Sequence, residues 1–576
     1  MATPADLTAT DPTGPTGSAI PTAVPLPADS IEVPVDGHPD NERSNTGDDH
    51  SSDTTSPRPA QRLAFVGLAA VVFMVAACGL VYELALIALG SYLMGDSIRQ
   101  TAIVLGIFVF SMGIGSLLTK HRTNRPITTF VAIECALGLL GGLSVLLLYA
   151  SFAWLHLYMP SLVLIAFLIG ALIGAELPLL ATLFDGIRHR STGETVADLF
   201  ALDYVGALLG GLAFPFLLLP TVGLLTGTML VGVVNVLCAL ALALVVFRHD
   251  LTRRTRNTIV AGTLAVLALL GAGIWFADDF EVTARQALFR DPIVRAERTP
   301  YQEIVITENP AGGRAGDVRL FLNGNLQFAS IDEHRYHETL VHPAMRGSRR
   351  SVLILGGGDG LALREVLRYP DVETVTLVEL DPQMIALART DARFTTLNRS
   401  SFADPRVQVV TQDAFTFIRD NARTFDVVLI DFPDPDTPGT AKLFSVEFYG
   451  MLSRWIAPEG RVVLQASSPY FAPLVFWDIE VNLRAAGFNT TPFHVDVPSF
   501  GDWGFHLATF DVAASPGMPP PLQLPDDRPP LRFLTPEVLT AAQTFAPDQR
   551  PAEALQPSTL LQPHILDYQQ RSWRAY

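Results

Sequence analysis

Seven apolar runs between residues 63 and 276 constrain the fold of this chain more than any other feature. A helix needs about 20 residues to cross the roughly 30 Å hydrocarbon layer of a membrane, and each run is about that long or longer. We therefore predict a polytopic α-helical membrane bundle over residues 61–276. The expected spans are 63–90, 101–119, 128–154, 160–184, 200–219, 222–247 and 258–276.

The composition agrees with insertion into a membrane. Hydrophobic residues make up 49% of the 576 residues, charged residues make up only 17%, and the mean hydropathy is +0.32. The net charge of −17 argues against a nucleic-acid binder, which would show a basic surface. A small cationic molecule is a better match for so acidic a chain.

Small and acidic residues interrupt the apolar runs. Close helix contacts are expected at the small residues Gly113, Gly115, Gly206, Gly210 and Gly211. Four acids fall within or near the runs, at Glu83, Glu134, Glu176 and Asp203. Because an ionisable group is costly in a bilayer, these acids indicate either a polyamine-binding or conducting cavity or buried polar contacts that fix helix packing. The sequence leaves both interpretations open.

The two ends of the chain differ from this region. Residues 1–60 hold ten acidic residues, two basic residues and ten prolines, so we expect a disordered acidic tail. Beyond residue 276, short β-branched runs alternate with helical patterns, which is typical of a doubly wound parallel sheet. We predict a small β-strand subdomain over 277–345, a Rossmann-like domain over 346–512 and a proline-rich, loosely packed extension over 513–576.

The Rossmann-like prediction depends on one strand, turn and helix. The strand at 351–355 (SVLIL) leads directly into the turn at 356–360 (GGGDG), and a helical pattern follows. Glycines allow positive φ angles and a close approach of the backbone to a nucleoside. The next two predicted strands lead to Glu379 and Asp413, whose carboxylates could accept hydrogen bonds from ribose hydroxyls and an adenine amino group.

These acids favour an adenosine ligand without a pyrophosphate, because Asp359 within the glycine turn would repel phosphates. The same charge distinguishes two sulfonium donors. S-adenosylmethionine carries a carboxylate, whereas decarboxylated S-adenosylmethionine presents an ammonium group there. Asp359 suits the ammonium group.

A fourth predicted strand (FDVVLI) leads to Asp431, and Asp434 follows three residues later in a proline-rich turn. Two carboxylates at this edge could form a metal site, a cation clamp or a general base with its partner. No histidine or cysteine accompanies them at ligand spacing, so a metal is the weakest of the three options.

At these residues the sequence resembles the polyamine aminopropyltransferases, the spermidine synthase family. Together with the apolar first half, it resembles the membrane-bound bacterial branch of that family. The likeness covers about residues 280–510. It rests on YQEI at 301–304, NGNLQ at 323–327, DEHRYHETLVHP at 332–343, LGGGDG at 355–360, VELD at 378–381, QDA at 412–414 and DFPDP at 431–435.

The resemblance implies transfer of an aminopropyl group from the co-substrate decarboxylated S-adenosylmethionine to putrescine, giving spermidine and methylthioadenosine without a metal. It implies that Asp431 accepts the proton of the attacking amine. Contacts to the nucleoside would come from Gln302, Glu379, Asp413, Ala414 and Pro438. Contacts to the amines would come from Asp359 for the aminopropyl ammonium, His337 and Asp434 for the substrate, and Tyr336 and Gln327 for the channel.

The chemistry is consistent with these positions. A protonated amine, with a pKa of about 10.4, has no lone pair to attack the carbon next to the sulfonium. A carboxylate with an ordinary pKa of about 3.9 is a weak base. We expect like charge from Asp434 and Asp359, together with desolvation, to raise the pKa of Asp431.

Two segments depart from the family pattern. The family commonly has IPTY in the segment that closes over the amine, whereas VPSFGDWGF places Phe500 at the tyrosine position. A hydroxyl is lost there unless Asp502 substitutes for it, so putrescine is the default acceptor rather than a deduction. DFPDP also replaces the commoner serine-containing turn.

Two other functions stay open at this point. A related S-adenosylmethionine-dependent methyltransferase would bind the intact, carboxylated donor. A non-catalytic polyamine transporter or sensor would bind its ligand in the Rossmann-like half without turnover. The expected partners besides the amines are membrane lipid and, because dimers are usual in the resembled family, a second copy of the chain.

The topology gives conflicting indications. Lysine and arginine are concentrated in the segments on one side of the runs, and Arg99 alone lies on the other side, which places the N-terminus in the cytoplasm and, after seven spans, the C-terminal half outside. The donor is expected to be made in the cytoplasm, which favours a cytoplasmic catalytic half. We expect the cytoplasm, on the supposition that one apolar run does not fully cross.

Overall fold

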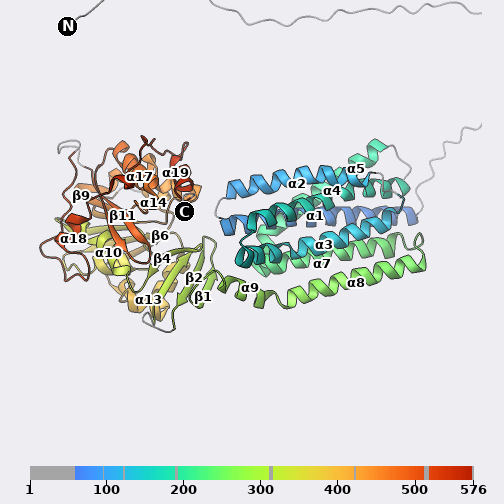
Figure 1. Ribbon diagram of the computed structural model, residues 1–576, viewed down its shortest axis with the longest axis horizontal. Coiled ribbons are helices and arrows are strands. Elements are labelled where there is room, and N and C mark those ends of the chain that lie inside the picture. Colours follow the sequence, from blue (N-terminus) through green and yellow to red (C-terminus); the bar gives the residue numbers. More distant parts are fainter. Residues whose placement is uncertain are drawn as a thin grey trace, which may run out of the picture. The chain divides into compact units, whose positions relative to one another are not determined.

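The computed structural model describes residues 59–94, 97–120, 124–187, 192–310, 316–420, 423–510 and 518–573. The acidic tail predicted for residues 1–60 therefore lies outside the described residues, except for its last two. The described part forms an apolar helical bundle, a small antiparallel sheet and a larger α/β domain (Figure 1). This order of parts confirms the predicted fold class.

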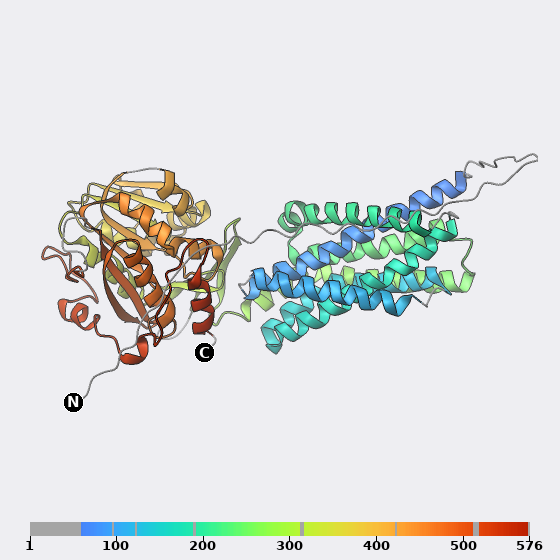
Figure 2. The same cartoon turned by 90° about the horizontal axis from the view of Figure 1, so that it is seen from above.

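Within the described residues, seven helices are long and apolar enough to cross a membrane. Each coincides with one predicted run, because a helix satisfies every backbone polar group of an apolar segment within the segment itself. Length and composition give no support to the supposition that one run fails to cross. The helices run side by side, as Figure 2 shows in blue to light green. Their bounds are α1 Pro59–Met94, α2 Ser97–Thr119, α3 Pro126–Ala150, α4 Tyr158–Ile187, α5 Thr192–Ala213, α7 Leu224–Ala241 and α8 Arg253–Trp275, with η1 Ser151–Leu155, η2 Phe214–Leu218, α6 Leu219–Val222 and η3 Leu242–Val246 as short extensions.

Glycines form the closest contacts between these helices. A Cβ at Gly115 of α2 would lie 1.9 Å from a backbone carbonyl oxygen of α4. A Cβ would also lie within 3.0 Å of atoms of α1 at Gly206, Gly210 and Gly211. Nothing lies within 4 Å of the Cβ position of Gly113, so its predicted helix contact is wrong. Two residues along a helix correspond to roughly 200° of rotation, which turns Gly113 away from the face that Gly115 presents to α4.

The small sheet has four antiparallel strands in the order β1-β2-β3-β4. Its strands are β1 Ile293–Arg298, β2 Glu303–Glu308, β3 Val318–Leu322 and β4 Asn325–Ala329. Helix α9 (Ala277–Gln286) precedes the sheet, and α10 (Glu333–Val341) with the short η4 (His342–Met345) follows it. The sheet confirms the small β-rich part of the predicted fold class.

The larger sheet has the order β10-β11-β9-β8-β5-β6-β7. Its strands are β5 Ser351–Gly356, β6 Thr374–Glu379, β7 Val407–Thr411, β8 Phe425–Asp431, β9 Ile456–Gln465, β10 Asn489–Val497 and β11 Gly501–Thr509. Strands β5 to β9 pair in parallel, and β10 and β11 add an antiparallel edge. The first four are the strands that the sequence predicts before the glycine turn and before each acidic strand end.

Helices and short helical turns connect the strands of this sheet. They are α11 Leu361–Val366, α12 Pro382–Thr390, α13 Ala392–Leu397, η5 Ser401–Ala403, α14 Ala414–Asp420, α15 Pro438–Ala441, η6 Lys442–Phe444, α16 Val446–Leu452, η7 Ser453–Trp455 and α17 Pro473–Ala485. Side chains alternate along β5, with Leu353 and Leu355 in one core and Val352 and Ile354 in the other. Both faces of the sheet are therefore buried, as a parallel sheet requires.

The C-terminal extension packs into both cores, so the prediction of loose packing is wrong. It contains α18 (Pro536–Ala541), η8 (Pro547–Gln549) and α19 (His564–Trp573). Leu534 joins one core and Ile565 joins the other, with 2% and 0% exposure. The carboxylate of Glu338 on α10 accepts the backbone N–H groups of residues 532–534 at 2.7–3.0 Å. The extension has few apolar residues among many prolines, so its composition does not indicate that it packs into the cores.

Candidate active site

The glycine turn and the end of β8 lie side by side. Strand register pairs Gly356 with Asp431 across β5 and β8. Gly356, Gly357 and Gly360 have φ angles of +82°, +64° and +82°, a region that favours glycine. A Cβ at Gly357 would lie 3.2 Å from Asp431 Oδ2. The turn thus leaves space for the Asp431 carboxylate at the point of the sheet where ligands of doubly wound folds bind.

Helix α10 supplies two predicted site residues to this point. The Tyr336 hydroxyl donates a hydrogen bond to Asp431 Oδ1 at 2.5 Å. The next side chain, His337, is 2% exposed, and its ring centroid lies 5.0 Å from that of Tyr336. His337 Nδ1 lies 2.9 Å from Glu333 Oε2, and since this carboxylate can only accept, the nitrogen donates.

The carboxylates at this edge are electrostatically perturbed. Burial raises the pKa of Asp431 to about 6 and the charge of Asp359 acts in the same direction, against the charge of His337 and the Tyr336 hydrogen bond. Burial likewise raises the pKa of Asp359, whose Oδ1 accepts the Leu361 N–H at 2.8 Å. The expected rise in the pKa of Asp431 is therefore confirmed in direction. Two of its expected causes, burial and the charge of Asp359, are confirmed as well.

Asp434 has surroundings of its own. Burial raises its pKa to about 6, although Ser467 and Gln465 donate hydrogen bonds to it at 3.0 and 3.4 Å. Asp434 is not among the groups that raise the pKa of Asp431, so the like-charge contribution expected from it is not found. The two carboxylates have different partners, since Tyr336 donates to Asp431 whereas Gln465 and Ser467 donate to Asp434.

A buried ion-pair chain supports His337. Arg364 on α11 donates to both carboxylate oxygens of Glu333 at 3.0 and 2.9 Å. Burial alone would raise the pKa of Glu333, but His337 and Arg364 lower it to about 2. Burial would lower the pKa of His337, yet its hydrogen bond and charge interaction with Glu333, aided by Asp359, raise it. Because Nδ1 donates to Glu333, the neutral form of the His337 ring keeps Nε2 as an acceptor beside the carboxylates.

The acid that ends β6 also lies against the glycine turn. A Cβ at Gly358 would lie 2.7 Å from Glu379 Oε2. Burial raises the pKa of Glu379 to about 7, against the backbone hydrogen bond from Asp381 at 3.0 Å. Gln302 reaches this edge from the small sheet, because its Nε2 donates to Asp381 Oδ2 at 3.0 Å. The structure thus places Gln302 near Glu379, the acid predicted to bind the ribose. The link between them is Asp381, which was not singled out from the sequence.

Asp413 and Ala414 lie at the start of α14. Lys442 Nζ lies 2.9 Å from Asp413 Oδ2, and Thr416 N–H donates to Oδ1 at 2.9 Å. Burial would raise the pKa of Asp413, but these contacts lower it. Pro438, the first residue of α15, is exposed. Lys442 was missed because a lone lysine in a helix carries no sequence signal of pairing with a strand-end acid.

Gln327 and Asp502, two residues singled out from the sequence, are hydrogen-bonded to groups other than the active-site carboxylates. Gln327 on β4 donates from Nε2 to the carbonyl of Asn325 at 3.1 Å, and no hydrogen bond within the described residues joins it to an active-site acid. Phe500 lies against Tyr336 with ring centroids 6.0 Å apart. Asp502, expected as a substitute for the missing hydroxyl, is instead bound by His494 at 2.5 Å and Gln549 at 2.7 Å.

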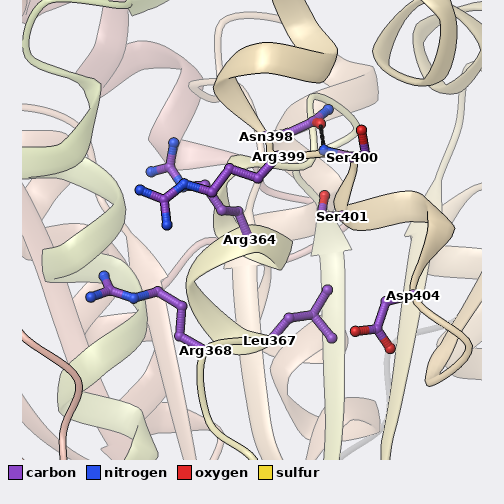
Figure 3. Close-up of a pocket in the computed structure, with 8 residues that line it drawn as sticks. All are labelled: Arg364, Leu367, Arg368, Asn398, Arg399, Ser400, Ser401 and Asp404. Atoms are coloured by element: carbon purple, nitrogen blue, oxygen red, sulfur yellow. Dashed lines mark hydrogen bonds between the residues drawn. The ribbon is translucent and has the colours of Figure 1, made fainter.

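A separate cavity of 310 Å³ is lined by residues that contact the glycine turn, and Figure 3 shows these residues. Three arginines line it, Arg364 among them, and none of the predicted site residues does. Ser401 donates to the Gly360 carbonyl and Asn398 to the Asp359 carbonyl, both at 3.0 Å. These two hydrogen bonds therefore fix the backbone of the glycine turn.

The arrangement can bind cations and accept a proton. Asp359, Asp431 and Asp434 all lie close enough to Tyr336 to raise the pKa of its hydroxyl. Burial brings the pKa of the latter two to about 6. Carboxylates in that range are stronger bases than free ones and still attract ammonium groups. Within the described residues, no group of three or more His, Cys, Asp or Glu side chains is placed to hold a metal ion.

Comparison with known proteins identifies the family of the chain. The family described as spermine/spermidine synthase domain matches residues 333–515. Polyamine aminopropyltransferase 1 of Streptomyces coelicolor is 53% identical over 505 residues, covering 88% of this chain and 94% of that protein. The polyamine aminopropyltransferase of Mycobacterium tuberculosis is 45% identical over 516 residues, covering 88% and 96%. A solved spermidine synthase in complex with the transition state analogue AdoDATO matches with a TM-score of 0.38 and 23% identity, over 49% of this chain and 89% of that one. High identity over nearly the whole length of these relatives shows that the chain belongs to the polyamine aminopropyltransferase family.

Proposed function

We propose that this aminopropyltransferase uses decarboxylated S-adenosylmethionine as donor and putrescine as acceptor, and releases spermidine and methylthioadenosine. The observation that carries the proposal is the position of Asp431, beside the glycine turn, hydrogen-bonded to Tyr336 and with its pKa raised to about 6. A half-buried carboxylate close to another acid suits both a cationic substrate and proton transfer.

The nucleoside side of the donor would lie along the strand ends of β6 and β7. Glu379 would accept hydrogen bonds from the ribose, and Gln302, held to Asp381 at 3.0 Å, would close over it. Asp413 would accept from the adenine amino group, with Ala414 and Pro438 beside the base. The glycine at 358 leaves room for this, because a side chain there would displace Glu379.

The amine side would lie between α10 and the ends of β5 and β8. Asp359 would bind the aminopropyl ammonium. Asp434, fixed by Ser467 and Gln465, would bind the distal ammonium of putrescine together with His337. Tyr336 and Gln327 would line the path of the amine, and Phe500 supports Tyr336 by ring packing.

The proposed reaction begins when Asp431 removes a proton from the attacking ammonium. The freed nitrogen lone pair forms a bond to the carbon attached to sulfur. The carbon–sulfur bond breaks, its electrons go to sulfur, and the sulfonium becomes the neutral thioether of methylthioadenosine. Holding nitrogen and carbon in line supplies much of the rate, since well-oriented pairs reach effective molarities of about 10⁵ M or more.

The test is product formation by the full-length protein in detergent or lipid nanodiscs. Methylthioadenosine release is measured with decarboxylated S-adenosylmethionine and a panel of diamines and polyamines. Spermidine formed from putrescine at the highest kcat/KM supports the proposal, and preference for another amine overturns the acceptor assignment. Asp431→Asn should lower kcat by about 10²-fold or more and keep nucleoside binding. Unchanged kcat in that variant would remove Asp431 as the base.

We also propose that the α/β domain faces the cytoplasm, where its donor is expected to be made. Seven crossings then put the N-terminus outside, against the distribution of lysine and arginine. Protease added to intact cells distinguishes the alternatives. A cytoplasmic domain stays uncut until the cells are permeabilised, whereas cleavage in intact cells places it outside.

A further inference from the structure

Four polar side chains meet inside the membrane bundle. They come from four helices, with Tyr82 on α1, Glu134 on α3, Glu176 on α4 and Asn235 on α7. Their exposed fractions are 0%, 0%, 4% and 0%. So complete a burial of two carboxylates in an apolar bundle is costly and calls for a physical reason.

Glu134 interacts with each of the other three side chains. Asn235 Nδ2 donates to Glu134 Oε2 at 2.5 Å. The carboxyl groups of Glu134 and Glu176 lie within hydrogen-bond reach of each other. The Tyr82 hydroxyl has both carboxylates among its electrostatic neighbours. The group is therefore one cluster, and we call it the intramembrane acid site.

One oxygen of each member lacks a partner. These oxygens are Tyr82 Oη, Glu134 Oε1, Glu176 Oε1 and Asn235 Oδ1. Buried polar atoms are almost always hydrogen-bonded, and leaving one without a partner destabilises the fold. All four oxygens can accept a hydrogen bond, and only the tyrosine hydroxyl can also donate one. The site thus lacks positive charge.

The surrounding groups do not supply that charge. Among the described residues, the titratable groups that face the two carboxylates from the packed helices are Cys78, Cys135, Asp203 and Cys238. None of them is cationic. Two buried carboxylates without a compensating charge cannot both stay ionised at low dielectric, so the site needs a bound positive charge.

We propose that the intramembrane acid site binds one exchangeable monovalent cation, either a proton or a sodium ion, through oxygens from four helices. With 0–4% exposure of its side chains, the closed site suits a bare cation rather than the alkyl chain of a polyamine. Either cation would supply the missing positive charge, since a proton can bridge the two carboxyl groups and a sodium ion takes oxygen ligands. This site lies outside the proposed transfer reaction and does not depend on it.

The experiment measures thermal unfolding of the full-length protein in nanodiscs. In one arm, sodium chloride replaces choline chloride at constant ionic strength and pH. In the other, pH is varied in choline chloride alone. A sodium site raises the unfolding midpoint with sodium concentration by about 2 °C or more, and a proton site raises it as pH falls. A wild type that responds to neither overturns the proposal.

The variants assign the response to the site. Glu176→Gln should remove the shift of the unfolding midpoint with sodium, or make its shift with pH smaller than in the wild type. The neutral amide leaves only one carboxylate in the site, which needs no bound cation to balance a second one. Glu83→Gln, which changes a half-buried acid of the bundle outside the site, should keep both. A sodium response that survives in Glu176→Gln, or a pH response as large as that of the wild type, contradicts the proposal.

Infrared difference spectra of the folded protein add a readout that packing alone would not change. If the cation is a proton, the wild type shows a protonated carboxyl band near neutral pH that is lost in Glu134→Gln. If it is sodium, adding the ion removes the band. If Glu176→Gln fails to fold, the wild-type arms together with this band decide, and an absent or insensitive band with no thermal response rejects the site.

Discussion

At the scale of residues, the surroundings of each carboxylate set its chemistry more than the spacing in the sequence does. Asp431 and Asp434 are three residues apart, yet Tyr336 donates to the first and Ser467 to the second. Their pKa values are raised to about 6 mainly by burial. The sequence places both acids at a strand end but contains no direct signal of these partners.

Tyr336→Phe tests the hydrogen bond to Asp431. The hydroxyl stabilises the ionised carboxylate, so its removal should raise the pKa of Asp431 further above about 6. Because the proposed base must be deprotonated, the acidic limb of the kcat/KM profile should move to higher pH by about one unit. Activity then falls most below neutral pH and recovers above it. An acidic limb at the wild-type position would show that this carboxylate does not control the rate.

At the scale of elements, the periodic segments were predictable and their side-chain partners were not. The strand, glycine turn and helix around 351–366 follow from an apolar run, consecutive glycines and a helical pattern. Glu333 stands four residues before His337 on α10, a spacing that could have identified the pair had the helix been predicted. Arg364 and Lys442 join the site only through tertiary contacts, which one sequence does not display.

Gly358→Ala tests the contact between the turn and β6. The added Cβ would lie 2.7 Å from Glu379 Oε2 and force that side chain to move. Affinity for methylthioadenosine, measured calorimetrically on the full chain, should fall by about 10-fold or more while the fold persists. Gly450→Ala on α16, where nothing lies within 4 Å of the Cβ position, is the matched control and should bind normally. Equal affinities in the two variants would refute the position of Glu379.

Glu338→Ala tests the attachment of the C-terminal extension to α10. Glu338 is 1% exposed and accepts three backbone N–H groups, which would lose their partner. The free energy of unfolding should fall by about 2–4 kcal/mol in denaturant titrations. Transfer activity should fall as well, because α10 carries Tyr336 and His337. Glu373→Ala, an exposed acid paired with Arg350 at 3.5 Å, should stay within about 0.5 kcal/mol of wild type. A similar loss in both would mean that the extension is not held by Glu338.

At the scale of the whole molecule, the sequence predicts two halves of different physical character, and the structure contains both. Apolar run length predicts the seven membrane helices because lipid leaves the backbone no other partner. Alternating strands and helices predict the α/β domain. The convergence of Glu134, Glu176 and Asn235 was not predictable, because which faces of three helices meet depends on close packing at glycines such as Gly138 and Gly232.

We expect acids around the glycine turn to select a donor bearing an ammonium group over one bearing a carboxylate. Calorimetric titration of the full-length protein with decarboxylated and intact S-adenosylmethionine tests it most directly, in wild type and in Asp359→Asn. We predict that wild type binds the decarboxylated donor about 100-fold more tightly, and that Asp359→Asn loses at least about 10-fold of this preference. Equal or tighter binding of the carboxylated donor by wild type would contradict the claim.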